Sequence, residues 1–301
     1  MTSTPYEFLC DQSRASFGGD EFVFVELGED MDLAEALRIQ AITTELTRLN
    51  LAGVVDVAPA NASYMIRLDP DVLDARRLIQ VLDGLHRQFA DSCTVSLDTD
   101  IVEIPVWYDD PATSETCMKF RDRHQSSTET DIQYTARVNG FSSIDELISA
   151  HSSAPFIVTF PCFKPGNTES MQLVPRNRQI QAPKYLRPRT ETPSRAVAHG
   201  GAFTVIYPTK GVGGYQLLGR SPVPVVDLAQ TTPGFQKSMV LTTSSSLIQF
   251  RPIHGDQYSE IRASSKMGIY QYNRHPVTFV LSRFLDDPVG YAAELKGTLR
   301  W

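Results

Sequence analysis

Apolar and polar positions in the first third of the chain alternate between strand spacing and helix spacing. Residues 21–27 form an apolar run that predicts a buried strand, and an amphipathic helix follows it. Asp32 and Glu35 have the spacing of a capping pair at the start of this helix. The apolar face of the helix consists of Ile39, Ile42, Leu46 and Leu49.

The same stretch continues with two strands, a second helix and a further strand. These elements are predicted at residues 54–57, 64–68, 71–89 and 101–107. The resulting order, β-α-β-β-α-β, is the split arrangement of ferredoxin-like domains. We therefore expect a ferredoxin-like domain over residues 1–108, and because no titratable cluster stands out within it, a scaffold or docking role.

The pattern changes after residue 108. Residues 109–154 are expected to be a linker with a short helix at 144–151, which Ser143 and Glu146 would cap. The apolar runs of residues 155–255 are short and separated by Pro and Gly, which is typical of a β-barrel or sandwich. Its strands are predicted at residues 156–160, 196–198, 203–207, 215–218, 223–226 and 247–251. Residues 256–301 are expected to be a C-terminal extension with a strand at 277–281 and a helix at 289–296, so the fold class is α+β.

The composition fits a two-domain globular protein and narrows the classes of partner. The chain has 301 residues, of which 42% are apolar and 21% charged, and its formal net charge is −7. This acidic balance argues against nucleic acid as a partner. No apolar run approaches the roughly 20 residues that span a bilayer, and the N-terminal residues do not resemble a secretion signal. We therefore expect no membrane partner and a soluble, cytoplasmic protein.

Cysteine and histidine usage predicts reduced thiols and no metal site. The four cysteines form no CxxC pair, and they are Cys10, Cys93, Cys117 and Cys162. The six histidines are scattered, without an HxH or HExxH motif. Cys162 could be a nucleophile only with a base beside it, and a buried histidine with satisfied hydrogen bonds explains His199 more simply than catalysis does.

A glycine-rich stretch at residues 185–220 needs a further explanation. Two glycine pairs, Gly200-Gly201 and Gly213-Gly214, bracket an apolar run at 202–207. Glycine beside a strand is kept where the chain turns tightly or where another backbone or a ligand comes close. Basic and hydroxyl side chains crowd the same stretch: Lys184, Arg187, Arg189, Thr190, Arg195, Tyr207, Lys210 and Arg220. The stretch could hold a small planar or anionic group; the alternative is a barrel corner whose glycines serve geometry alone.

Common catalytic and nucleotide-binding motifs do not account for this stretch. The run GVGG at residues 211–214 is not a GxGxxG motif, because Gln216 stands where the third glycine belongs, and no P-loop lysine follows. The run GRSPV at residues 219–223 lacks the second glycine of a nucleophile elbow. These motifs therefore predict no enzyme that works by itself.

The order of the pieces resembles a known family, allophanate hydrolase subunit 1, which is also described as the B component of bacterial 5-oxoprolinase and occurs in the carboxyltransferase region of urea carboxylase. The N-terminal part is similar through GDEFVFVELGEDMD, GVVDVAPANASYMIRLDP and VEIPVWYD. The second part is similar through ELISAHSSAPFIVTF, PRTETPSRAVAHGGAFTVIYP and GGYQLLGRSPVPVVDL, of which GGYQLLGR is the most specific. The segment KYLRPRTETP and the C-terminal tail resemble the urea carboxylase type most.

The resemblance implies a ferredoxin-like N-terminal domain, a cyclophilin-like β-barrel and a subunit of a biotin-dependent carboxyltransferase-like complex. In such a complex carboxybiotin delivers CO₂ to a urea-like or amide nitrogen, and this subunit is inactive alone. The implied partners are a homologous second carboxyltransferase subunit (allophanate hydrolase subunit 2 type), a biotin carrier or biotin carboxylase protein, and a small-molecule substrate. The complex would use ATP, and biotin would be carried on a partner, with neither bound covalently here. Two alternatives remain, the B component of an ATP-dependent 5-oxoprolinase-type amide hydrolase and a kinase-inhibitor-type regulatory binding protein.

Carboxyl transfer to a weakly nucleophilic nitrogen needs a dry pocket, donors for a developing oxyanion and a general base. We expect the catalytic groups among Lys184, Arg189, Tyr207 and Arg220. Substrate contacts are expected from Thr190, His199, Gly200, Gly201, Gly213, Gly214, Tyr215 and Gln216. For each side chain a structural hydrogen bond or surface ion pair is the alternative. Two departures from the family pattern, Asn167 after Pro165-Gly166 and Val212 before the second glycine pair, leave the fold intact.

Overall fold

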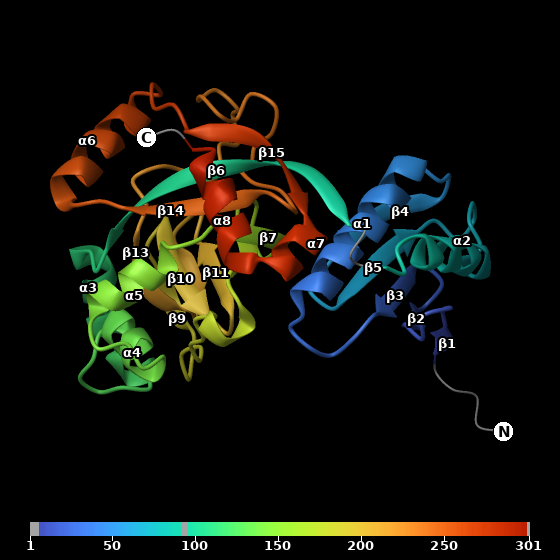
Figure 1. Ribbon diagram of the computed structural model, residues 1–301, viewed down its shortest axis with the longest axis horizontal. Coiled ribbons are helices and arrows are strands. Elements are labelled where there is room, and N and C mark those ends of the chain that lie inside the picture. Colours follow the sequence, from blue (N-terminus) through green and yellow to red (C-terminus); the bar gives the residue numbers. More distant parts are fainter. Residues whose placement is uncertain (1–5, 92–94, 300–301) are drawn as a thin grey trace. The chain divides into compact units, whose positions relative to one another are not determined.

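The computed structural model describes residues 6–91 and 95–299, and the chain divides into two compact units (Figure 1). The first unit comprises Met1–Leu97 and Thr278–Asp286. The second comprises Asp98–Val277 and Asp287–Trp301. Both contain helices and strands, so the protein has a mixed α and β fold.

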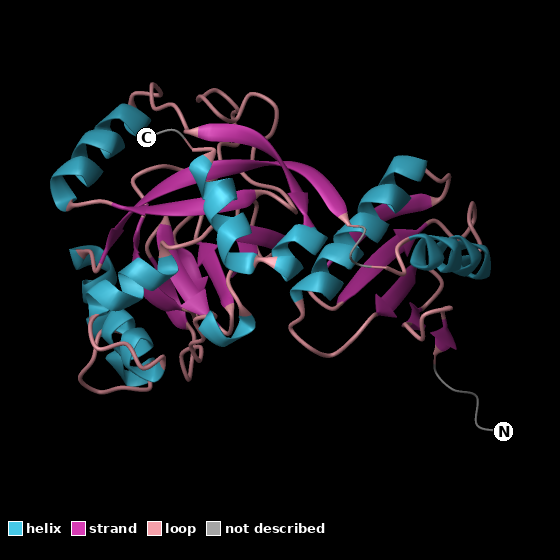
Figure 2. Cartoon of the chain, viewed as in Figure 1, coloured by secondary structure: helices cyan, strands magenta, loops and turns pink. Residues whose placement is uncertain are grey.

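The first unit is a five-stranded antiparallel sheet with two long helices, α1 (Leu33–Leu49) and α2 (Ala75–Gln88), packed on one face (Figure 2). The strand order is β1-β2-β3-β5-β4, and the bounds in that order are Glu7–Phe8, Arg14–Gly18, Phe22–Glu26, Ser63–Leu68 and Val54–Pro59. Alternate residues of β3 and β5 face the helices, so Val23, Val25, Tyr64, Ile66 and Leu68 are buried. A short helix, α7 (Leu281–Asp286), belongs to the same unit.

Both helices begin at an aspartate cap. The Asp32 side chain accepts the N–H groups of Ala34 and Glu35 at 2.7 and 3.1 Å, which confirms the predicted start of α1. Asp74 caps α2 in the same way, so α2 begins at Ala75 rather than at the predicted residue 71.

Strand β6 (Ser96–Tyr108) differs from the expectation for this unit. The apolar pattern places it in the first sheet, yet it pairs in the second unit, parallel to β14 (Leu247–Pro252). The place beside β3 is taken by β2, which a tight turn at Gly19 joins to β3. Neighbouring strands close a hairpin at little entropic cost, so this local pairing occupies the edge of β3.

The second unit is built on eight strands in the order β13-β10-β11-β8-β7-β14-β6-β15. β13 also pairs with β6, so the pairings from β13 round to β6 form a closed ring. The strands not yet located are β13 (Gln216–Arg220), β10 (Ala196–Gly200), β11 (Phe203–Ile206), β8 (Thr168–Gln172), β7 (Phe156–Pro161) and β15 (Arg274–Val280). A separate two-stranded sheet pairs β9 (Arg189–Thr192) with β12 (Gly211–Gly213). The apolar core of the unit includes Val102, Ile104, Phe156, Val158 and Phe250.

Three helices, α3 (Pro111–Lys119), α4 (Asp131–Val138) and α5 (Ile144–His151), precede β7, and α4 packs against β13 and α5 (Figure 1). Helix α5 has the predicted bounds, and Ser143 accepts the N–H of Glu146 as expected. Helix α3 arises in the polar segment that the pattern leaves without an element, because Asp110 caps it and Pro111 fits its first turn. Two 3-10 turns, Arg121–Arg123 and Arg176–Arg178, complete this part.

Other elements depart from the apolar pattern for identifiable reasons. The strand predicted at residues 223–226 is wrong, since Pro222 and Pro224 cannot donate hydrogen bonds and only an isolated bridge from Val226 to Val240 forms. The pattern does not predict α6 (Gly255–Lys266), whose only buried residue is Tyr258, nor β8. Helix α8 (Pro288–Gly297) contains the predicted C-terminal helix.

Among the described helices, none has the length and apolar character needed to cross a membrane. Cys10, Cys117 and Cys162 are free thiols, in agreement with the expectation for them. Cys93, the fourth cysteine, lies outside the described residues.

Candidate functional site

A cavity of about 340 Å³ in the second unit collects five residues predicted from the glycine-rich stretch. They are Lys184, Tyr207, Gly213, Gly214 and Tyr215. The β7–β8 hairpin supplies Cys162, Phe163, Asn167 and Glu169, and the same glycine-rich stretch supplies the rest of the wall, Tyr185, Pro188, Val205 and Val212. This volume suits a small-molecule ligand.

A larger cavity of about 530 Å³ in the same unit is a weaker candidate. Among its described lining residues only Arg178 carries a charge, and none of the predicted site residues lines it. Catalysis needs convergent polar groups, so the smaller cavity is the better candidate site.

Glu169 is the buried carboxylic acid in the wall of the smaller cavity. Its side chain is buried, and the Tyr215 hydroxyl donates to the carboxylate from 2.9 and 3.0 Å. Burial raises the pKa of Glu169, while the hydrogen bond from Tyr215 and the charge of Lys184 oppose that rise. The Lys184 ammonium lies 4.9 Å from the centre of the Tyr215 ring. A carboxyl with a raised pKa beside a lysine and a tyrosine is suited to moving a proton.

Two of the predicted glycines are required by close approach inside the protein. A Cβ atom on Gly200 would lie 2.5 Å from the Tyr215 ring. A Cβ atom on Gly213 would lie 2.6 Å from the hydroxyls of both Tyr207 and Thr192. The glycines therefore let two tyrosines reach the cavity wall, which is the close-approach role expected of them.

Cys162 lines the cavity as a thiol rather than a thiolate. The amide of Asn167 lies 3.0 Å from its sulfur, and a Glu169 oxygen lies 3.5 Å away. Burial and the neighbouring Glu169 charge raise its pKa to about 12. A base does stand beside Cys162, but the carboxylate disfavours the thiolate that a nucleophile needs.

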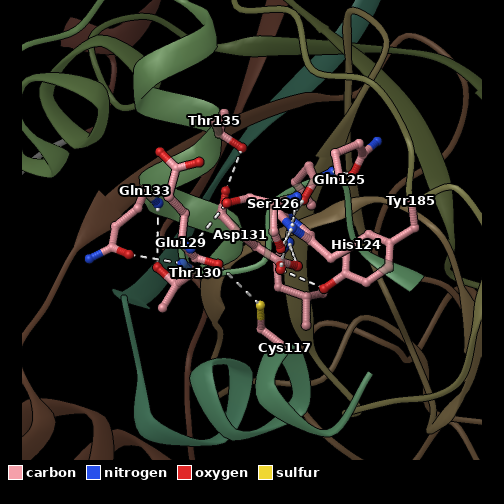
Figure 3. A network of polar contacts seen from close by, with 12 residues as sticks. Cys117, His124, Gln125, Ser126, Glu129, Thr130, Asp131, Gln133, Thr135 and Tyr185 are labelled. Carbon is pink, nitrogen blue, oxygen red and sulfur yellow. Dashed lines mark hydrogen bonds and ion pairs between the residues drawn. The ribbon is translucent and has the colours of Figure 1, made fainter. Parts of the chain in front are cut away.

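A buried polar network fixes one wall of the cavity, and Figure 3 shows Tyr185, His124 and Asp131 turned toward one another. The Asp131 carboxylate accepts from the Tyr185 hydroxyl at 2.5 Å and from the N–H of Leu217 at 2.7 Å. His124 Nε2 and Arg189 Nη1 lie 3.6 Å from the same carboxylate. The Tyr185 ring also lies over the Arg189 guanidinium, with 4.3 Å from Cζ to the ring centre. The network therefore ties α4 to β13 and holds Tyr185 in the wall.

Cys117, His124 and Asp131 in this network are close enough for a shared metal ion, with candidate ligand atoms within 4.8 Å. Their hydrogen bonds favour another role. Nε2 of His124 lies 2.9 Å from the side-chain oxygen of Gln216, which can only accept, so Nε2 donates a proton there, while Nδ1 contacts both the N–H and the carbonyl of Ser126. Burial raises the pKa of Cys117 to about 12, which keeps the thiol protonated. A metal would have to displace both protons beside the Arg189 cation.

Other predicted residues lie in the protein interior, away from the cavity lining. Both ring nitrogens of His199 are bonded, to Thr204 and to the Ile180 carbonyl at 2.9 Å, and burial lowers its pKa to about 4. Gln216 is fully buried and joins His124 to the Pro183 carbonyl. For these two residues the structure supports the alternative of a structural hydrogen bond.

Five more predicted residues, of which Gly200 is one, are also absent from the cavity lining. Thr190 is exposed on β9, and Gly201, with φ of +60°, forms a bridge with Ala182. Arg220 ends β13, where its Nε lies 3.4 Å from the buried Asp110 carboxylate. Arg189 is fully buried in the network behind Tyr185.

Glu169 and Asp131, the two carboxylates around which these groups are arranged, are not predicted from the sequence. Glu169 lies in β8, whose residues TESMQ are all buried although most are polar. The Pro165-Gly166 turn after β7 is a usable signal, because such a turn predicts that the next residues return as a paired strand. Asp131 follows the Thr130 cap of α4, where an acidic residue usually needs no functional explanation.

Comparisons with known proteins agree with this architecture. The family profile described as carboxyltransferase domain, subdomain C and D, matches residues 13–236. Urea amidolyase of Saccharomyces cerevisiae is 22% identical over 271 residues, which cover 89% of this chain and 15% of that protein. The B component of 5-oxoprolinase from Escherichia coli O157:H7 is 26% identical over 223 residues, which cover 74% of this chain and 90% of that protein. The crystal structure of Kluyveromyces lactis urea carboxylase has the same fold, with a TM-score of 0.79 at 20% identity over 96% of this chain and 26% of that one.

The family match extends over more than two thirds of the chain and confirms the resemblance drawn from the motifs. The chain spans only 15% of the length of the yeast relative, so it corresponds to one part of that larger protein. The chain belongs to the carboxyltransferase domain family of subdomains C and D and is homologous to urea amidolyase and to the B component of 5-oxoprolinase.

Proposed function

We propose that this chain is one subunit of a biotin-dependent carboxyltransferase-like complex that acts on a urea-like or amide nitrogen, and that it is inactive alone. Membership of the carboxyltransferase domain family supports the proposal. The buried Glu169 carboxyl in a cavity of about 340 Å³ carries it, because a nitrogen that accepts a carboxyl group must give a proton to a base.

The residues of the cavity have complementary roles in this proposal. Glu169 takes the N–H proton of the acceptor, and its raised pKa makes it a stronger base than an exposed carboxylate. Tyr215 orients the carboxylate, and the Lys184 cation favours an anionic group in the cavity. Val205, Val212 and Pro188 give the cavity an apolar part of its wall.

Biotin and ATP enter the proposal through partners. Carboxybiotin on a partner carrier protein would supply the carboxyl group, and a biotin carboxylase partner would use the ATP. Lys184 could donate to the polar ureido group, and the apolar side chains of Val205 and Val212 suit the hydrocarbon part of such a group. A homologous second carboxyltransferase subunit would complete the active site.

The second candidate is the B component of an ATP-dependent 5-oxoprolinase-type amide hydrolase without biotin. The match to that component of 5-oxoprolinase favours it, because the alignment covers 90% of the relative and 74% of this chain. A carboxyl base beside a lysine would equally serve a lactam or an amide that loses and regains a proton.

The proposal includes the finer description of the fold as a ferredoxin-like N-terminal domain followed by a cyclophilin-like β-barrel. The order β3-α1-β4-β5-α2 and the antiparallel sheet support the first part. The closed ring of pairings from β13 to β6 supports the second part. The predicted boundaries at residues 154 and 255 belong to the same description, whereas the boundary expected at residue 108 falls after β6, and the two compact units divide between Leu97 and Asp98.

A native pull-down of this chain from its host tests the function, with streptavidin detection of biotin. A homologous partner together with a biotinylated protein is the expected result, and bicarbonate-dependent ATP turnover is then measured on the complex. The partner without biotin would favour the amide hydrolase. Recovery of the chain with neither would refute both enzyme proposals.

The role of Glu169 is tested in the recovered complex with Glu169→Gln. Loss of a general base is expected to lower kcat by roughly 10²–10⁴-fold. The control is Glu115→Gln, which makes the same change on the exposed face of α3. Equal activity of the two variants would remove Glu169 from the mechanism.

A further inference from the structure

Arg189 is a buried cation whose hydrogen-bonding groups are unused. Its side chain has 0% exposure, and within the described part of the chain Nε, Nη1 and Nη2 have no hydrogen-bond partner. A guanidinium carries five N–H donors and keeps its charge at any physiological pH. Burying it without acceptors costs several kcal/mol, so an arginine in this position needs a further partner.

The neighbours of Arg189 do not supply that partner. Asp131 lies 3.6 Å from Nη1, which is an ion-pair distance but too long for a hydrogen bond. Its carboxylate already accepts two shorter bonds, from Tyr185 and from the N–H of Leu217. Tyr185 covers one face of the guanidinium, whereas the N–H groups point outward from its edge.

A second unused polar group lies on the same strand. Thr192 Oγ1 is buried and has no hydrogen-bond partner within the described residues. Thr192 and Arg189 both belong to β9, and Gly213 of β12 is paired with Arg189. A Cβ atom on Gly213 would lie 2.6 Å from both Thr192 Oγ1 and the Tyr207 hydroxyl. Two hydroxyls therefore meet at this glycine, and the Arg189 cation is near enough to Tyr207 to lower the pKa of its hydroxyl against the effect of burial.

We propose that Arg189, Thr192 and Tyr207 form a binding site for a small planar oxyanion, either a carboxylate or bicarbonate. The planar fork of a guanidinium matches the two oxygens of such a group, and the two hydroxyls add donors. Tyr185, Tyr207 and Gly213 also line the cavity of Glu169, so the oxyanion site lies behind that wall. The inference depends on the unused donors and holds whatever reaction the complex performs.

The purified chain is tested by thermal unfolding with formate, bicarbonate or 5-oxoproline, at constant ionic strength set with chloride. Formate or bicarbonate is expected to raise Tm saturably, whereas formamide, the neutral analogue of formate, is not. Thr192→Val is expected to weaken the apparent affinity for the anion at least tenfold. Thr128→Val makes the same change at an exposed position and should leave that affinity unchanged. Line broadening of ¹³C-formate in NMR on the unmodified protein gives a reading that needs no variant.

The results separate the two sources of the oxyanion. Binding of bicarbonate without 5-oxoproline would identify the free ion as the occupant. Tighter binding of 5-oxoproline than formate, lost in Tyr215→Phe, would identify the carboxylate of a ligand that also fills the cavity. An equal effect of formamide and formate, or no effect of any anion beyond chloride, would overturn the proposal and leave water as the partner of Arg189. The test uses no catalytic readout, so its failure does not bear on the carboxyltransferase proposal.

Discussion

Glu169 links the stability of the second unit to pH in a direction that its surroundings determine. Burial is the largest influence and raises its pKa above the ordinary value of 4.5, against the Tyr215 and Cys162 hydrogen bonds and the Lys184 charge. In the unfolded chain the same carboxyl has its ordinary pKa. A carboxyl whose pKa rises on folding contributes stability that is fully present below the unfolded pKa. That contribution is lost as the pH rises through the folded pKa.

Glu169→Gln isolates this effect, because glutamine keeps the shape and still accepts from Tyr215 but does not ionise. We expect the free energy of unfolding of the wild type, relative to the variant, to fall as the pH rises above 4.5 and to level off above the folded pKa. Each unit by which folding raises the pKa corresponds to about 1.4 kcal/mol of that fall. The slope never exceeds about 1.4 kcal/mol per pH unit, because a single proton is involved.

The assay is urea unfolding of both proteins over a pH range of roughly 4 to 9, followed by Trp107 fluorescence in a Trp301→Phe background. Taking the difference between the two proteins cancels the titration of other buried groups such as Asp110. Glu115→Gln, compared with the wild type in the same way, should give a flat profile. A flat or rising profile for Glu169→Gln would mean that Tyr215 and Lys184 outweigh burial, and the argument for a strengthened base would fail.

Three further predictions follow from single contacts. Gly200→Ala is expected to lower the free energy of unfolding by roughly 1–3 kcal/mol, because its Cβ would lie 2.5 Å from the Tyr215 ring. A Cβ atom on Gly201 would meet no atom within 4 Å, so Gly201→Ala should lower stability only through its φ of +60°. In urea unfolding, Gly200→Ala should alter the pH profile that Glu169 causes, and Gly201→Ala should not. Arg220→Ala is expected to cost about 1–3 kcal/mol, since it removes the cation from buried Asp110 while Arg220 itself is partly solvated. Adding Asp110→Asn should recover most of that loss in urea unfolding, and an additive double variant would contradict the pairing. Cys162, with a pKa of about 12, should react with iodoacetamide about tenfold faster for each unit of pH, and rapid labelling at neutral pH, read by mass spectrometry, would show that it is a thiolate.

Periodicity predicts the elements whose ends and buried faces are determined by residues close in the sequence. Helix α5 has the predicted bounds because its cap at Ser143 and its apolar face lie within eight residues. Strand β6 is found by its apolar run, but its neighbours are decided by the distant β14, which no local pattern encodes. Strand β8 is not predicted, because its polar residues are buried by the rest of the ring.

The site is predictable where backbone geometry constrains it. Gly200 and Gly213 allow the close approach of two tyrosines that line the cavity, and Gly213 and Gly214 line it themselves. The same stretch could not show which basic residues converge. Arg220 and Gln216 are at opposite ends of β13, four residue steps or about 13 Å apart. Arg220 therefore meets Asp110, at the start of α3, instead of the cavity.

Tyr185 is the group through which the cavity and the proposed oxyanion site would affect each other. It lines the cavity, gives its hydroxyl to Asp131 and covers the Arg189 guanidinium. An oxyanion bound to Arg189 would weaken the pull of that cation on Asp131, and Asp131 holds both Tyr185 and β13. Binding at one site would then alter affinity at the other by the same factor, as linkage requires. The buried Arg189 cation also interacts more strongly with a bound anion than a cation in the open cavity would, because water in the cavity would screen the charge.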